Sequence, residues 1–219
     1  MFPFNYIICS NELGNGRISK VYKIQEVELP HTVLIAKIYD ISKRNEYEKE
    51  ENILMKLSEP NDNNEIRNDY IIKLKNIDVI LEHSNLVNND SKYLIFDYLI
   101  HGNLSEYLYI IPIINQFKED HIKLLCYKLL RSLKKCFEQK ISHNKLDINN
   151  IMLDNEFNPI LIHFSEATIN ELNNNFNKDL YDLGIILAKL ITSGKFKSIK
   201  FSPKFKKYII NFILFFMHK

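Results

Sequence analysis

The sequence predicts an α+β fold whose first part is mainly β-strand and whose remainder is mainly helix. Runs of β-branched and aromatic residues between turn formers fill the N-terminal part of the chain. Apolar residues at helical spacing dominate the C-terminal part. The 219 residues are enough for one good-sized core or for two small lobes. We therefore expect one domain over residues 1–219, divided into lobes of about 1–98 and 99–219.

The N-terminal part is expected to form a small antiparallel sheet with one helix. Five strands are predicted, at 6–8, 20–24, 32–39, 70–74 and 93–98. A glycine-containing turn at 13–16 separates the first two, and a polar surface turn is expected at 85–90. Residues 42–57 change to a helical pattern, which Pro60 and the polar residues after it end.

The C-terminal part is expected to be mostly helical. Helices are predicted at 121–139, at 179–192 with a stop at Gly194, and from Pro203 to about residue 217. The apolar run at 208–217 is shorter than the about 20 residues that a membrane-spanning helix needs. It is expected to be a buried helix.

Composition argues against several classes of partner. The net charge of +2 gives no general attraction to nucleic acid or to an anionic membrane. The cysteines Cys9, Cys126 and Cys136 lack the spacing of a zinc site and suggest no disulfide framework. The N-terminus lacks the pattern of a signal peptide. An intracellular, cytoplasmic protein is therefore expected.

Residues 143–150 carry the most informative pattern. They resemble the catalytic loop of protein kinases, His-Arg-Asp-Leu-x-x-x-Asn, with His143, Leu146 and Asn150 in place. The position of the catalytic Asp holds Lys145. Residues 13–22 resemble the Gly-rich loop of the same family, although alone they would suit an ordinary hairpin turn. Further segments match the family in order, at 36–37, 50–54, 93–99, 102–108, 158–165 and 179–184. The resemblance implies a two-lobed protein kinase-like fold with a reduced C-lobe.

The resemblance also implies a nucleotide site. Lys37 would reach the phosphates of ATP with Glu50 as its partner, rather than the neighbouring glutamates Glu46, Glu48 and Glu51. Phe96 would be the gatekeeper. The remaining residues implied to hold ATP are Gly14, Gly16, Val21, Ala36, Asp97, Leu99 and Met152. A buried column, anchored by Asp179, would contain Leu54, Leu74, His143 and Phe164.

The chain departs from the family at the positions that carry the chemistry. Lys145 replaces the general base, whose assistance is typically worth about 10²–10⁴-fold in rate. His163 replaces the Asp that binds Mg²⁺, and a neutral imidazole is a poor ligand for a cation that prefers oxygen. Asn150 remains as one oxygen ligand. We therefore expect no metal site, or at most a weak one.

The segment between Ser165 and Asp179 is short and lacks Ala-Pro-Glu, so the platform for peptide substrates is expected to be lost. Asn144 stands where the family has an Arg, so a phosphate on Thr168 would lack its cationic partner.

Three functions remain open from the sequence. The first is a pseudokinase that acts by binding a partner protein and binds ATP weakly, with little dependence on Mg²⁺. The second is an atypical but active Ser/Thr kinase, in which a neighbouring carboxylate would replace the lost base. Asp147 lies too close to Asn150 for the spacing of the family, and the alternative reading of Asp154 and Glu166 is that they are surface groups. The third is a pure scaffold whose nucleotide pocket is occluded by side chains such as Phe96 or His163.

Overall fold

The computed structural model describes residues 4–10, 12–15, 18–29, 31–59, 70–75, 79–82, 91–108, 119–169 and 176–191. The chain divides into two compact units. The first contains Met1–Ser58 and Ile72–Tyr98, and the second contains Glu59–Ile71 and Leu99–Lys219. The assignment of residues 59–71 to the second unit was not predicted from the sequence.

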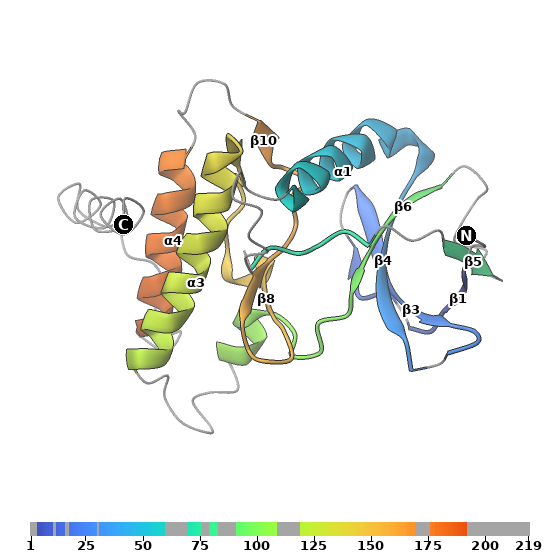
Figure 1. The fold of residues 1–219 in the computed structure, drawn as a ribbon, viewed down its shortest axis with the longest axis horizontal. Coiled ribbons are helices and arrows are strands. Elements are labelled where there is room, and N and C mark those ends of the chain that lie inside the picture. Colours follow the sequence, from blue (N-terminus) through green and yellow to red (C-terminus); the bar gives the residue numbers. More distant parts are fainter. Residues whose placement is uncertain are drawn as a thin grey trace. The chain divides into compact units, whose positions relative to one another are not determined.

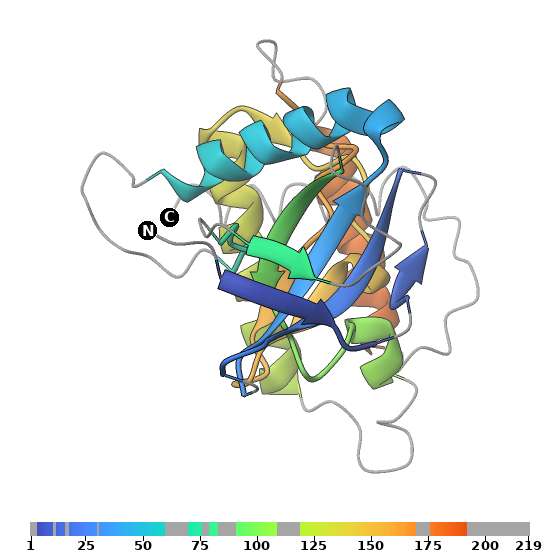
Figure 2. The same cartoon turned by 90° about the vertical axis from the view of Figure 1, so that its right-hand side faces the viewer.

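The first unit contains a sheet with strand order β5-β1-β3-β4-β6, in which β2 also pairs with β3 (Figure 2). The strands are β1 Phe4–Ile8, β2 Gly14–Asn15, β3 Ser19–Glu26, β4 Val33–Tyr39, β5 Val79–Glu82 and β6 Lys92–Asp97. All pairings are antiparallel except that of β1 with β5. The antiparallel meander is therefore present, with one parallel strand added at its edge.

The strand predicted at 70–74 is wrong, because this run bonds to two different neighbours. Leu161 N–H donates to the Tyr70 carbonyl at 2.8 Å, whereas Lys75 N–H donates to the Ile95 carbonyl at 2.9 Å. Tyr70 also has φ of 52°, which interrupts an extended chain. Only an isolated bridge at Ile71 results. Strand β5, which follows, was missed, although its sequence Val-Ile-Leu-Glu is a short apolar run.

Helix α1, Arg44–Ser58, packs against the first unit's sheet (Figures 1 and 2). Asp40 caps the short 3₁₀ turn before it, accepting from Ser42 N–H at 2.9 Å. Side chains alternate along β4, so Lys37 and Tyr39 point to one face of the sheet and Ala36 to the other. The side of Ala36 forms an apolar core of Tyr6, Tyr22, Ile24, Leu34, Ala36, Ile38 and Ile95.

The second unit is built on two helices that lie side by side, α3 Glu119–Glu138 and α4 Phe176–Ile191 (Figure 1). Both confirm helices predicted from the sequence. Leu129 of α3 and Leu183 of α4 are fully buried, as the apolar spacing requires. Short elements follow α3, namely β7 Ile141–Ser142, a 3₁₀ turn Ile148–Asn150, β8 Ile151–Leu153, β9 Pro159–Leu161 and β10 Thr168–Ile169. Strand β7 pairs with β10, and β8 pairs with β9.

Residues 104–108 form a further helical segment in the second unit. Its start is a reciprocal cap: Asn103 Oδ1 accepts from Glu106 N–H at 2.9 Å, and Glu106 Oε2 accepts from Asn103 N–H at 3.2 Å. Gly102, with φ of 69°, brings the chain into this cap. The segment lies within 102–108, one of the ranges that resemble the protein kinase family. The predicted stop at Gly194 and the helix from Pro203 lie outside the described residues.

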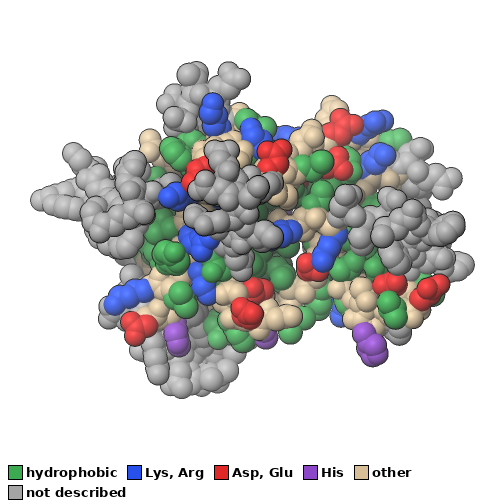
Figure 3. All heavy atoms as spheres, in the orientation of Figure 1, with side chains coloured by type: hydrophobic (Ala, Val, Ile, Leu, Met, Phe, Trp, Pro, Cys, Tyr) green, Lys and Arg blue, Asp and Glu red, His purple; other side chains and the backbone are tan. Residues whose placement is uncertain are grey.

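The described surface carries both signs of charge. In Figure 3, basic and acidic side chains lie interspersed over the described part of the face shown. Several form exposed pairs within one helix, such as Arg44 with Glu48 at 2.8 Å and Lys178 with Asp182 at 2.8 Å. In the described part of the chain, no helix combines the length and the apolar character needed to cross a membrane.

Candidate functional site

The first unit contributes a buried ion pair. Lys37 Nζ on β4 lies 2.6 and 2.7 Å from the two carboxylate oxygens of Glu50 on α1. The two residues are only 6% and 2% exposed. Such a pair is stable only where geometry and further hydrogen bonds compensate for lost hydration. The predicted partner of Lys37 is thus the observed one, while Glu46 lies near Lys43, Glu48 near Arg44 and Glu51 near Tyr47.

Tyr39 completes this ion pair and was missed from the sequence. Its hydroxyl donates to Glu50 Oε2 at 2.5 Å, and the residue is fully buried. Burial raises the pKa of Tyr39 above its ordinary value, and the charge of Glu50 and the hydrogen bond to it add to the effect. The sequence could have predicted this contact, because Tyr39 follows Lys37 by two residues on one strand and its side chain therefore points to the same face.

The other predicted residues of the first unit are dispersed along its strands. Gly14 lies in β2, where a Cβ atom would make only ordinary contacts at 3.7 Å with Val21. Val21 is half-buried, and Ala36 belongs to the apolar core. Phe96 is buried, and the exposed Asp97 carboxylate pairs with Lys75 at 2.8 Å. Gly16 lies outside the described residues. Contact of these residues with adenine or phosphate stays a prediction.

In the second unit, Asp179 fixes the loop that contains His143. Its carboxylate oxygens accept from the backbone N–H groups of His143 at 2.7 Å and Asn144 at 2.8 Å. Burial raises the pKa of Asp179 to about 6, although the two backbone donors act in the opposite direction. The anchor predicted for this residue is thus present as two hydrogen bonds from the start of α4 to the loop.

The His143 ring serves to hold the same loop in place. Its Nδ1 accepts from Lys145 N–H at 3.3 Å, and its Nε2 lies 2.9 Å from the Ile162 carbonyl. These two contacts together assign the proton to Nε2. The ring also meets Phe164 edge-on, with centroids 4.9 Å apart, and both residues are fully buried. Leu54 is likewise buried in the first unit, and Leu74 is half-buried.

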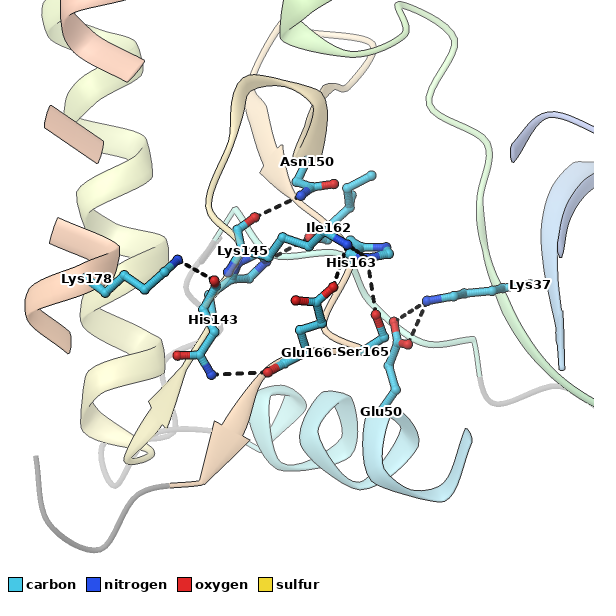
Figure 4. A network of polar contacts seen from close by, with 11 residues as sticks. Lys37, Glu50, His143, Lys145, Asn150, Ile162, His163, Ser165, Glu166 and Lys178 are labelled. Atoms are coloured by element: carbon cyan, nitrogen blue, oxygen red, sulfur yellow. Dashed lines mark hydrogen bonds and ion pairs between the residues drawn. The ribbon is translucent and has the colours of Figure 1, made fainter. Parts of the chain in front are cut away.

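Lys145 lies at the centre of the polar network in Figure 4. Its ammonium is 2.6 Å from Glu166 Oε1 and 3.2 Å from His163 Nε2. Its carbonyl accepts from Asn150 Nδ2 at 2.8 Å, so the side-chain amide of Asn150 supports the loop. The position of the general base therefore holds an ammonium group that already donates to two neighbours.

His163 is placed by an unusual backbone conformation, with φ of 70°. Its Nε2 faces both the Lys145 ammonium and Ser165 Oγ, each at 3.2 Å. Because an ammonium group can only donate, this ring nitrogen acts as an acceptor. Leu99 and Met152, the predicted adenine contacts of this unit, are half-buried, and Met152 lies in β8.

This set of donors does not fit Mg²⁺. Magnesium requires oxygen ligands in octahedral geometry, whereas His163 offers a nitrogen that faces the Lys145 cation. Across the described ranges, no three or more His, Cys, Asp or Glu side chains are grouped so that they could hold a metal ion.

The carboxylates that could replace the missing base are engaged elsewhere. Asp147 caps the 3₁₀ turn by accepting from Asn149 N–H at 3.0 Å, and its pKa is lowered by this backbone bond and by Lys189 against the opposing effect of burial. Asp154 accepts from two backbone N–H groups of the β8–β9 hairpin, at 2.9 and 2.8 Å. Glu166 is paired with Lys145.

Asn144 holds the short segment after Ser165. Its side-chain amide donates to Thr168 Oγ1 at 2.9 Å and to the Glu166 carbonyl at 3.1 Å. Lys178 donates to the Asn144 carbonyl, a contact that the sequence did not reveal. A neutral hydrogen bond therefore stands where the family would pair an Arg with a phosphate.

Comparison with known families agrees with this arrangement. A family model described as protein kinase domain matches residues 8–182, which is more than half of the chain. The matched range includes the Lys37–Glu50 pair, the Lys145 loop and Asp179. The chain belongs to the protein kinase domain family.

Proposed function

We propose that this protein kinase domain is a pseudokinase that acts by binding a partner protein and does not transfer phosphate. The observation that carries the proposal is the Lys145 ammonium, 2.6 Å from Glu166 and 3.2 Å from His163. A general base must accept a proton from the attacking hydroxyl, and a protonated lysine has no lone pair to do so. Nearby, Asp147 and Asp154 are fixed by backbone hydrogen bonds.

The residues at the expected metal-binding positions also support this proposal. Phosphoryl transfer depends on cations that neutralise charge on the phosphates. His163 contributes no oxygen, and the bond from the Asn150 amide nitrogen to the Lys145 carbonyl leaves the Asn150 amide oxygen as one oxygen ligand, which is few for Mg²⁺. These two features support a domain in which the fold is retained without the reaction. A binding role follows because a folded kinase domain without transfer can still act through its surfaces.

The proposal includes weak binding of ATP. The Lys37–Glu50 pair is formed with Tyr39 as a third member, so a buried cation is held in a defined position. A lysine side chain that is already held in position favours the binding of phosphate groups, because it loses little conformational entropy when the ligand binds. Since the described residues of the second unit include no group of side chains suited to holding a metal ion, the affinity for ATP is expected to depend little on Mg²⁺.

This expectation can be checked by titrating the full chain with ATP in a calorimeter, once with excess EDTA and once with Mg²⁺. The dissociation constants for ATP with EDTA and with Mg²⁺ are expected to differ by less than about threefold. A site in which the metal ion and the nucleotide bind cooperatively would show a larger difference. Lys37→Met is expected to weaken ATP binding under both conditions. Arg44→Met, a control at an exposed position of α1, is expected to leave both affinities unchanged. Tight binding only with Mg²⁺ would support the active kinase instead, and no binding under either condition would support the occluded scaffold.

A further inference from the structure

The Lys145–Glu166 ion pair lies at the surface of the second unit, and neither side chain is buried in the core. The two side chains are 44% and 47% exposed, although their charged atoms are 2.6 Å apart. Exposed ion pairs contribute little net stability, because water and salt screen them. The carboxylate of Glu166 is therefore a counter-ion that another anion can replace at small cost.

The backbone of Lys145, in contrast, is held firmly. Asn150 Nδ2 donates to its carbonyl, and its own N–H donates to the His143 ring. The two residues before it are bonded to Asp179. The ammonium group is thus presented from a fixed loop, which reduces the entropy lost when it binds a ligand.

Glu166 is brought to Lys145 by the segment that Asn144 holds. The Asn144 amide donates to the Glu166 carbonyl, and the pairing of Thr168 with Ser142 fixes the next turn of the chain. His163 Nε2, on the other side of the ammonium, is an uncharged acceptor. Lys145 and Glu166 therefore cancel each other's charge in this network (Figure 4).

We propose that Lys145 binds the polyphosphate chain of a nucleotide and that Glu166 competes with the phosphates for its ammonium group. This inference rests on the proposed function, since it lets the Lys145 ammonium take the role of a metal cation in nucleotide binding. Glu166 then acts as an autoinhibitory counter-ion. The affinity for phosphate is set by the exchange of one anion for another, and no covalent step is involved.

The test uses the full chain, excess EDTA and sodium tripolyphosphate, which has the phosphates without adenine. Glu166→Gln keeps the size of the side chain and removes its charge, so it is expected to tighten binding by about fivefold. The gain is expected to disappear in Glu166→Gln combined with Lys145→Met and to persist in Glu166→Gln combined with Lys145→Arg. Asp120→Asn, which alters net charge equally at a side chain 92% exposed on α3, is the matched control.

Equal affinities of Glu166→Gln and the unmodified chain, or an equal gain in Asp120→Asn, would overturn the inference. So would a gain that survives Lys145→Met. These results are distinct from failure of the proposed nucleotide binding, which appears as ATP affinity that does not respond to Lys37→Met. Both side chains are half-exposed, so we expect these substitutions to leave the fold intact, and circular dichroism of each variant checks this.

Discussion

Glu50→Ala is expected to lower the free energy of unfolding by about 3–5 kcal/mol, the usual cost of breaking a buried ion pair by removing one partner. Two buried donors lose their acceptor together, the Lys37 ammonium and the Tyr39 hydroxyl. Lys37 is 6% exposed, so water cannot readily replace the carboxylate. Urea denaturation of the full chain, followed by circular dichroism, measures the change.

Glu48→Ala is the matched control, because it removes a glutamate from the same helix. Glu48 pairs with Arg44 at 2.8 Å on the exposed surface, and its loss is expected to change stability by less than about 0.5 kcal/mol. Tyr39→Phe is expected to fall between the two, since it removes one of the donors to Glu50 and leaves the ion pair. Equal losses for Glu50→Ala and Glu48→Ala would show that the buried pair does not stabilise the first unit.

The double substitution Lys145→Asp with His163→Asp is expected to make ATP binding depend on Mg²⁺. It replaces an ammonium and an imidazole, now 3.2 Å apart, with two carboxylates. Carboxylate oxygens are the ligands that Mg²⁺ prefers, and the competing positive charge is removed. We expect Mg²⁺ to tighten ATP binding by at least about tenfold in this variant, against less than about threefold in the unmodified chain.

The control for this experiment is Lys145→Met with His163→Ala, which removes the same groups without supplying oxygen. It is expected to stay insensitive to Mg²⁺. If Mg²⁺ tightens ATP binding no more in the double aspartate variant than in this control, then the residues at positions 145 and 163 do not determine how ATP binding depends on Mg²⁺.

Much of the fold could be predicted because local pattern and local structure agree. The helix expected at 42–57 is α1, Arg44–Ser58, and the helix expected at 121–139 is α3, Glu119–Glu138. The run at 70–74 failed because its apolar composition suits a strand, whereas its two ends bond to different parts of the chain. Which neighbours a short run finds is a property of the tertiary fold, and composition does not contain it.

The candidate site was predictable only in part, for a similar reason. The pairing of Lys37 with Glu50 follows from the family's order of strand and helix, and the structure has it. The pairing of Lys145 with Glu166 joins residues 21 apart in sequence and depends on the contact of β7 with β10. Neither of these two-residue strands has a sequence signal of its own, so the sequence named Glu166 as a nearby carboxylate without revealing its pairing with Lys145.

The proposal that the domain transfers no phosphate is tested most directly by incubating the full chain with γ-labelled ATP, Mg²⁺ and a mixture of generic protein substrates. Labelled phosphate on the substrates and on the chain itself is counted against the Lys37→Met variant. We expect equal counts for the two proteins, because Lys145 cannot accept the proton of an attacking hydroxyl. Incorporation that exceeds this background and disappears in Lys37→Met would contradict the proposal and identify an active kinase.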